Sequence, residues 1–348
     1  MADRKPARKR VTRDDVAARA GVPPSTVSYV INNGPRSVST MARERVLKAI
    51  GELGYQPSDV ARSLRTQRSM TLGLVIPNTA NPFYADVARA VEEVGFEHGY
   101  TVFLCHSSHL PERERRYAEM LRAKYVDGAI FHPTTLDLEP LAMLSQAGIQ
   151  AVVLERSVPG YHCFVADERH GGYLATHHLI DLGHRRIGCI VRTGDLTSSA
   201  ARVEGYRAAL AEVGLPLDDR LTTESDFGFA AGAAATRRLL ELPDRPTALV
   251  THNDIIAIGA IKAAVDAGLQ VPADLSVVGY DDIAHAAYAV PALTTIAYPK
   301  HRMGRAAAQL LLRLLAGEET LRPATIVLPV QLMVRGSTAP PSCVRYSG

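Results

Sequence analysis

The 348-residue sequence is poor in the features that define several other classes of protein. It has no tryptophan, and its four cysteines form no C-x-x-C pair. No apolar run approaches the roughly 20 residues that span a membrane, and the basic N-terminus has no apolar segment of the kind found in a secretory signal. We therefore expect a cytoplasmic protein with reduced, buried thiols and no membrane partner.

The sequence also lacks the common catalytic motifs, with no G-x-S-x-G elbow, no H-E-x-x-H and no phosphate-binding loop. His177 and His178 are adjacent, so on a helix they point about 100° apart and cannot share a metal ion as an i, i+4 pair could. His98, His106 and His109 fall at a helix end and in a loop, which gives them no ligand geometry. The sequence therefore predicts no enzyme, no metal site and no cofactor.

Charge is distributed unevenly along the chain. Residues 1–68 hold 14 Lys and Arg against 6 Asp and Glu, a net charge of +8, whereas residues 69–348 hold 25 against 30, a net charge of −5. A basic segment joined to a near-neutral body is typical of a nucleic-acid-binding module attached to another domain. The first ten residues, a basic arm, contact DNA phosphates nonspecifically or serve only as a solubilising tail.

Residues 11–32, VTRDDVAARAGVPPSTVSYVIN, predict two short helices joined by a tight turn. Asp14 is placed to cap the first helix and Gly21 to end it. Apolar residues at i, i+3 and i+4 from Val27 face the second helix back onto the first. The outward face carries Ser25 and, two turns on, Asn32, as in a helix–turn–helix that enters a DNA major groove. A helical hairpin with a merely solvated face would have the same local pattern.

The next two segments favour the DNA-binding interpretation. Residues 39–54 form a third amphipathic helix, opened by Ser39 or Thr40, with Leu47 among its expected core residues. A short segment rich in Arg follows at residues 57–65. It is too short to be stable alone, so we expect it to order only on binding.

From about residue 70 the chain alternates apolar strands and helices, which predicts parallel sheets covered on both faces. The pattern runs through two successive units of similar size and therefore indicates two similar lobes. Many α/β enzymes have the same pattern, so periodicity alone does not decide the function.

Between residues 11 and 338 the sequence resembles the LacI/GalR family of bacterial transcription regulators. The matching text in the N-terminal part is VTRDDVAARAGV, STVSYVIN, RVLKAIGELGYQPS and VARSL. Further along it is NPFYADV, YVDGAIF, DLGHRRIGCI, RPTALVTHND, DLSVVGYDD and PALTTIAYP. One helix–turn–helix pattern is weak evidence, but a co-linear set of this length is specific.

The resemblance implies an α/β fold class: an N-terminal all-α headpiece with a hinge helix, then a two-lobed core of periplasmic-binding-protein type. The expected parts are the arm 1–10, the headpiece 11–56, the hinge 57–70, the core 71–338 and a tail 339–348. The chain crosses between lobes three times, so that the first lobe holds about 71–166 and 297–327 and the second about 167–296 and 328–338. A small-molecule effector then binds between the lobes, at the carboxyl ends of the strands.

The resemblance also implies which residues contact operator DNA. The expected set is Thr12, Ser25, Thr26, Ser28, Tyr29, Asn32, Ala61, Leu64 and Arg65, with Ser25 and Tyr29 at base edges and Leu64 as a wedge in the minor groove. Many members have Arg at the position of Tyr29, and Pro23 and Pro24 replace a polar pair. The half-site of the best-known members therefore cannot be assumed. Paired leucine wedges require two chains, and the tail has no leucine heptad, so we expect a homodimer on a pseudopalindrome.

The expected effector-binding residues are Phe83, Tyr84, Leu196, Ser198, Arg202, Phe227, Asn253 and Asp281. Asp281 accepts ligand hydrogens or caps a helix, and Arg202 holds a hydroxyl or carboxylate or forms an interlobe salt bridge. Asn253 suits a polyol but is also a common helix cap, and the aromatic residues stack on a ligand or belong to the core. Leu196 stands where the purine-binding member of the family has Arg, which argues against a purine.

Together these residues predict a cytoplasmic, nucleoid-associated transcription regulator, expected to be a repressor, that responds to a carbohydrate or sugar derivative. Two other classes stay open: a solute-binding protein, against which the basic headpiece argues, and a sugar-active α/β enzyme with an added DNA module. The sequence alone gives neither the operator sequence nor whether the effector releases the protein from DNA or recruits it.

Overall fold

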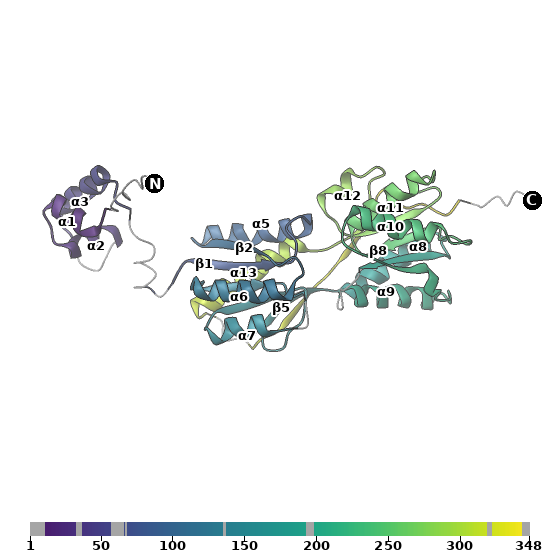
Figure 1. Ribbon diagram of the computed structural model, residues 1–348, viewed down its shortest axis with the longest axis horizontal. Coiled ribbons are helices and arrows are strands. Elements are labelled where there is room, and N and C mark those ends of the chain that lie inside the picture. Colours follow the sequence, from purple (N-terminus) through teal and green to yellow (C-terminus); the bar gives the residue numbers. More distant parts are fainter. Residues whose placement is uncertain are drawn as a thin grey trace, which may run out of the picture. The chain divides into compact units, whose positions relative to one another are not determined.

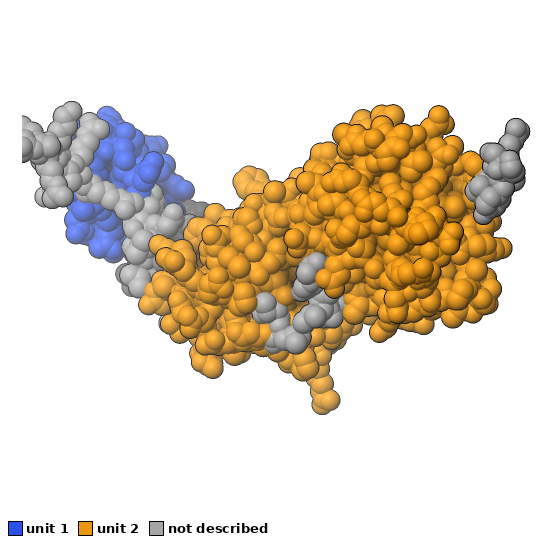
Figure 2. Space-filling model, turned by 45° about the vertical axis from the view of Figure 1, so that its right-hand side comes forward, with its two compact units in different colours: residues 1–69 blue, residues 70–348 orange. Residues whose placement is uncertain are grey.

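The computed structural model describes residues 11–32, 37–56, 66, 68–134, 137–192, 198–318 and 322–342. The chain divides into two compact units, residues 1–69 and 70–348, which are coloured separately in Figure 2. The first unit is the helical headpiece and the second is the two-lobed α/β core. The predicted fold class is confirmed in both.

The described part of the headpiece contains the helices α1 (Arg13–Ala20), α2 (Pro24–Asn32) and α3 (Thr40–Leu53). Thr12, and not Asp14, caps α1: its hydroxyl accepts from the Asp15 amide, and the Asp15 carboxylate accepts from the Thr12 amide in a capping box. The helix therefore begins one residue before Asp14. Gly21 ends it with a φ of 62°, as predicted.

The headpiece core is formed by one side of each helix. It contains Val16, Ala17, Ala20, Val27, Val30, Val46 and Ala49. Ser39 caps α3, but the prediction for Leu47 is wrong, because its side chain is 51 % exposed. Val46, Ala49, Ile50 and Leu53 follow the spacing i, i+3, i+4, i+7, and Leu47 lies about 100° away from that stripe.

The first lobe of the core is a six-stranded parallel sheet covered by helices on both faces (Figure 1). Its strands are β1 (Thr71–Ile76), β2 (Thr101–His106), β3 (Gly128–Phe131), β4 (Gln150–Leu154), β5 (His162–Ala166) and β11 (Thr325–Leu328), in the order β11-β5-β4-β3-β1-β2. Helices α5 (Pro82–Glu97) and α13 (Lys300–Ala316) pack on one face. Helices α6 (Pro111–Ala123) and α7 (Glu139–Gln146) cover the other.

The second lobe repeats this plan. Its strands are β6 (Ile187–Arg192), β7 (Thr222–Ser225), β8 (Ala248–Thr251), β9 (Ser276–Asp281), β10 (Thr294–Ala297) and the antiparallel β12 (Gln331–Met333), in the order β12-β10-β9-β8-β6-β7. Its helices are α8 (Glu168–Asp181), α9 (Ser198–Glu212), α10 (Phe229–Leu240), α11 (Asp254–Asp266) and the short α12 (Ala284–Tyr288), with a 3-10 turn at Asp219–Leu221. The chain passes between the lobes after β5, after β10 and after β11 (Figure 1).

Glycines let the helices of the second lobe approach one another closely. A Cβ added at Gly172 of α8 would lie 2.1 Å from the carbonyl oxygen of Arg202, and one added at Gly205 of α9 would lie 2.0 Å from that of Arg169. Because no side chain fits, α8 and α9 pack backbone against backbone. This contact fixes the start of α9, which carries Arg202.

Strand β2 differs from the expected pattern, because it lies at the edge of its sheet. Phe103 and Leu104 on β2 are 41 % and 51 % exposed, so this strand is not covered on both faces as predicted. Cys105, Cys163 and Cys189 are buried free thiols, and Cys343 lies outside the described residues. No helix in the described ranges combines the length and apolarity needed to cross a membrane.

Candidate DNA-binding and effector sites

Helix α2 presents the residues that the sequence assigned to DNA. Ser25 is exposed, and Thr26, Ser28 and Tyr29 are half-buried; the Ser28 hydroxyl accepts from Arg13 at 3.4 Å. The hydroxyl of Thr12 is occupied in the capping box, a role that the sequence analysis had not given it. The side chain of Asn32, and Ala61, Leu64 and Arg65 of the hinge, lie outside the described residues.

The two lobes place an acidic residue at the same position of their sheets. β4 is third in the first sheet and β9 is third in the second, and their carboxyl ends carry Glu155 and Asp281. Both residues have left-handed backbones, with φ of 59° and 109°. Such conformations are strained for residues other than glycine and persist at functional sites. The fourth strands, β3 and β8, are likewise each followed by a histidine, His132 and His252.

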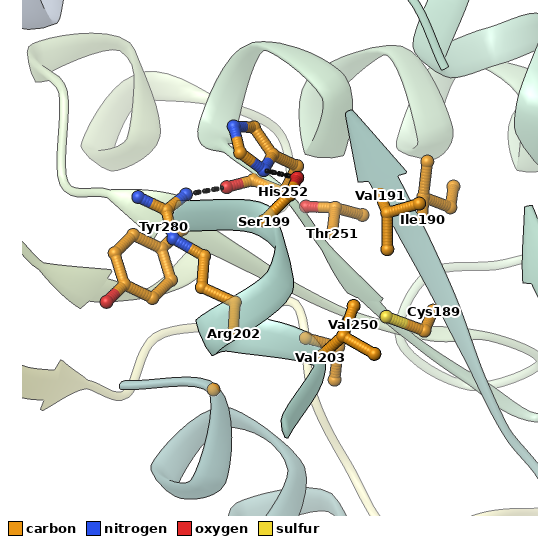
Figure 3. Close-up of a pocket in the computed structure, with 11 residues that line it drawn as sticks. Cys189, Ile190, Val191, Ser199, Arg202, Val203, Val250, Thr251, His252 and Tyr280 are labelled. Atoms are coloured by element: carbon orange, nitrogen blue, oxygen red, sulfur yellow. Dashed lines mark hydrogen bonds between the residues drawn. The ribbon is translucent and has the colours of Figure 1, made fainter. Parts of the chain in front are cut away.

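Arg202 is held in the second lobe by contacts with Glu168, His252 and Tyr280, of which Figure 3 draws the last two. Its Nε donates to the Glu168 carboxylate at 2.7 Å, its Nη1 donates to the His252 carbonyl, and its guanidinium lies 3.6 Å from the centre of the Tyr280 ring. Glu168 is the first residue of α8, so this salt bridge lies within the second lobe and is not the interlobe bridge considered from the sequence. The side chains of Arg202 and Glu168 are 13 % and 11 % exposed.

Acidic groups from both lobes are close enough to influence one another. Burial, with the charges of Asp254 and Glu155, raises the pKa of Asp281 well above its usual range, against the opposing charges of Arg202 and Lys300. Burial likewise raises the pKa of Glu168, and the charge of Glu155 adds to that effect while Arg202 opposes it. Glu155 of the first lobe therefore lies within electrostatic range of Glu168 and Asp281 of the second. We call Glu155, Glu168, Arg202 and Asp281 the interlobe cluster.

Lys300 links the two lobes beside this cluster. It begins α13, and its Nζ donates to the carbonyl oxygens of Asp281 and Asp282 at 2.9 and 2.6 Å. The same nitrogen lies 3.9 Å from the carboxylate of Asp86 on α5. A cation from the first lobe thus fixes the strained turn that carries Asp281.

The other predicted effector residues lie in several different structural settings. Asn253 caps α11, because its Oδ1 accepts from the Ile256 amide at 2.9 Å. Phe83 and Tyr84 are buried and meet edge to face, with ring centres 4.9 Å apart. Phe227 is half-buried against the core, Ser198 begins α9, and Leu196 lies outside the described residues.

A small cavity lies next to Arg202, inside the second lobe (Figure 3). Its walls include Cys189, Val250 and Val203, and its volume of about 20 Å³ is room for about one water molecule. In this structure the cavity is too small for a sugar. In the described residues no group of three or more His, Cys, Asp or Glu could hold a metal ion.

The sequence analysis missed Glu155, Glu168, His132 and Tyr280. One signal was available for Glu155: VVLE ends an apolar strand with an acid, as SVVGYD does at Asp281. The proximity of Glu168 to Arg202 had no signal, because 34 residues separate them in the sequence.

A helix–turn–helix headpiece joined to a two-lobed α/β core with a polar interlobe cluster defines a DNA-binding transcription regulator with a small-molecule site. Residues 12–58 match the model of bacterial regulatory proteins of the lacI family, and residues 176–338 match that of a periplasmic binding protein-like domain. The chain belongs to the LacI family of bacterial transcription regulators, whose named members are repressors and regulators rather than enzymes.

Individual relatives cover nearly the whole chain. The ribose operon repressor of Escherichia coli (strain K12) is 40 % identical over 329 residues, which are 94 % of this chain and 99 % of the relative. The lac repressor dimer bound to operator and the anti-inducer ONPF has a TM-score of 0.85 at 29 % identity, over 95 % of this chain and 100 % of that chain. A LacI family regulator from Enterococcus faecium with bound ribose has a TM-score of 0.72 at 30 % identity, over 78 % and 99 %.

Proposed function

We propose that the protein is a homodimeric repressor whose effector is a sugar bound at the interlobe cluster. The observation that carries this proposal is a polar cluster in which Arg202 is paired with Glu168 and in which Glu155 and Asp281 lie within electrostatic range. Ionised carboxylates only accept hydrogen bonds, whereas a protonated carboxyl also donates one, so a cluster whose Glu168 and Asp281 have raised pKa values calls for a ligand that both donates and accepts. The hydroxyls of a sugar do both.

The charge of the cluster selects against other ligand classes. The charge of Arg202 is already paired with Glu168, so its guanidinium, although it has further N–H donors, offers little net positive charge to a phosphate or carboxylate ligand. An anionic effector would meet like charges, which is costly in a buried site. The name of the ribose operon repressor and the ribose-bound regulator agree with a neutral sugar.

In the headpiece, Ser25 and Tyr29 would read base edges, and Thr26, Ser28, Asn32 and Thr12 would contact phosphates or neighbouring edges. Ala61, Leu64 and Arg65 would enter the minor groove from the hinge. Dimerisation is supported by the exposed Phe103 and Leu104 on an edge strand, an apolar surface that a second copy would cover. Operator DNA is the partner, so the protein would work in the cytoplasm, on the nucleoid.

The effector would act through the lobes. A sugar held by Asp281 of one lobe and Glu155 of the other favours one lobe arrangement, and that preference is transmitted to the two hinges of the dimer. The hinges then order or melt on DNA.

The first experiment is a thermal-shift screen of the purified protein against ribose, cellobiose, other sugars, sugar phosphates, nucleosides and amino acids. A ligand at 100 times its dissociation constant adds about 2.7 kcal/mol to the stability of the folded state. We expect a neutral sugar to raise the melting temperature. A hit confined to phosphorylated or nucleoside ligands would overturn the assignment.

The second experiment replaces Asp281 by Ala and measures operator binding with and without the sugar found in the screen. Operator affinity should stay and the response to sugar should disappear. The matched control is Asp219→Asn, which changes an exposed acid of the same lobe. An unchanged dose response in the Asp281 variant would remove that residue from the site.

A further inference from the structure

Behind Glu155 lies a buried histidine that the proposed effector site has not used. His132 follows β3, and its Nε2 is hydrogen-bonded to Oε2 of Glu155, which follows the neighbouring strand β4. Their side chains are 12 % and 15 % exposed. The ring of Tyr84 meets the imidazole edge to face, at 5.4 Å between ring centres and 85° between planes. The imidazole is therefore held in one orientation.

A second carboxylate lies close enough to the same histidine for the two charges to interact. Glu114 of α6 is fully buried, and its Oε1 accepts from the amide of Thr134 at 3.0 Å and from the Thr134 hydroxyl. Its other oxygen, Oε2, and the Nδ1 of His132 are buried and have no hydrogen-bond partner among the described residues. Each of the two side chains nevertheless senses the charge of the other.

The protonation of His132 follows from these neighbours. A protonated imidazole donates from Nε2 to the Glu155 carboxylate in a charge-assisted hydrogen bond, and its positive charge is favoured by the nearby Glu114. Burial lowers the pKa of His132, but the charge and hydrogen bond of Glu155, with the charge of Glu114, outweigh it, so the net pKa is raised above its ordinary value.

We propose that His132, held as an imidazolium by its hydrogen bond to Glu155 and by the nearby charge of Glu114, is a positioning residue that orients Glu155 toward the effector. The inference rests on the proposed function, because it assigns Glu155 to the sugar. With Oε2 occupied by His132, the remaining oxygen of Glu155 is the acceptor for a ligand hydroxyl. In the first lobe Glu155 then binds the ligand, as Asp281 does in the second lobe.

The groups that face His132 are its two acidic neighbours and Tyr84, and Asp137 acts on Glu114. Across the interlobe region, the charge of Glu155 raises the pKa values of Glu168 and Asp281 beyond the effect of burial. A positive charge on His132 offsets the charge of Glu155. Because the pKa of His132 is raised, its charge is complete below the ordinary histidine pKa and is lost as pH rises through the folded value. Sugar affinity should therefore be highest at acid pH and should fall as pH rises through the pKa of His132 in the folded protein.

The first test measures His132 directly and needs no ligand. In the full-length dimer, histidines labelled at Cε1 are titrated by NMR from about pH 5 to about pH 9, and the resonance of His132 is assigned from its loss in His132→Gln. We expect a pKa above that of an ordinary histidine, and a lower one in Glu114→Gln, whose amide oxygen still accepts from Thr134. A His132 that titrates at or below the ordinary value, or that ignores the Glu114 change, overturns the proposal.

The second test measures ribose binding, with cellobiose as a second probe, by calorimetry between about pH 6 and about pH 9. Wild-type affinity should fall with a midpoint at the pKa that NMR gives for His132. His132→Gln should bind about tenfold more weakly at the acid end, the effect of one charge-assisted hydrogen bond, and should lose the pH dependence. The matched control, His177→Gln, replaces a histidine on the surface of α8 and should behave as wild type.

The outcomes separate the two proposals. If no sugar of the screen binds the wild type, the proposed function fails and the effector role of His132 fails with it, whatever its charge. If the wild type binds a sugar and the affinity profiles of wild type and His132→Gln coincide, the sugar assignment stands and the role of His132 is overturned. Equal melting temperatures of wild type and His132→Gln at the acid end would exclude a folding defect as the cause of a weaker affinity.

Discussion

Asp254 is a buried acid whose ionisation should limit the stability of the core at neutral pH. It is the first residue of α11 and is fully buried. One carboxylate oxygen accepts from the amide of Ile283 at 2.8 Å, and the other accepts from the hydroxyl of Thr295. Burial raises its pKa from 3.8 to about 7, although these two hydrogen bonds oppose the shift. The informative change is Asp254→Asn, which replaces the carboxyl group by an amide group of similar shape that does not titrate.

The size of the effect follows from the difference between the two pKa values. A folded pKa of about 7 against 3.8 means that the folded chain binds a proton that the unfolded chain has released. The stabilisation that this bound proton gives the folded state is complete below about pH 4 and is lost as pH rises to about 7. The free energy of unfolding falls by about 4 kcal/mol over that range. The amide side chain introduced by Asp254→Asn does not titrate, so the variant should lack that loss. Its oxygen can accept from Ile283 and its NH₂ can donate to Thr295.

The assay is urea unfolding of the dimer at a fixed protein concentration, followed by circular dichroism at several pH values from about 5 to about 8. This range contains the upper part of the transition, so the wild type should lose about 2 to 3 kcal/mol more than the variant across it. Asp219→Asn, an exposed acid in the same lobe, serves as the control and should follow the wild type. Parallel profiles for wild type and Asp254→Asn would refute the assignment of a raised pKa to Asp254.

Three further predictions concern packing and assembly. Leu104→Glu should weaken the dimer about 100-fold or more, because it buries a charge in the proposed interface. Analytical ultracentrifugation measures the dissociation constant of the dimer. The control Leu217→Glu, at a site in the other lobe that is 46 % exposed, should leave the dimer intact. Gly172→Ala should destabilise the core by about 1 to 3 kcal/mol, since its Cβ would lie 2.1 Å from a carbonyl oxygen of α9; an unchanged melting temperature would contradict this close contact. Gly51→Ala in α3 meets nothing within 4 Å and should stabilise the headpiece by about 0.5 to 1 kcal/mol in thermal unfolding.

The secondary structure of this chain was largely predictable, because its apolar spacing follows the geometry of each element. Buried strands such as β1 and β8 are continuous apolar runs, and α2 carries its apolar residues at helical spacing. The errors concern features that depend on the third dimension. Leu47 is apolar but lies off the buried stripe, and β2 is apolar but partly exposed, because its sheet ends there.

The effector site was less predictable than the fold for the same reason. Arg202 and Asp281 were identified through the resemblance, but their surroundings depend on Glu168, Glu155 and Tyr280, which come from other elements. Nothing in the local sequence shows that a residue at the start of α8 will neutralise one in α9. Helix packing through Gly172 and Gly205 brings them together, and that close approach is visible only in the folded chain.

The strained backbones of Glu155 and Asp281 show how the two lobes could act together. Each left-handed residue costs of order 1 to 3 kcal/mol, so each must be held by its neighbours. Lys300 holds the turn at Asp281 from the other lobe, and His132 holds the side chain of Glu155. Because Lys300 bonds the carbonyls of this turn and also lies near Asp86, the position of Asp281 is tied to the first lobe. If the proposed effector site is correct, these side chains would couple effector binding to the arrangement of the lobes.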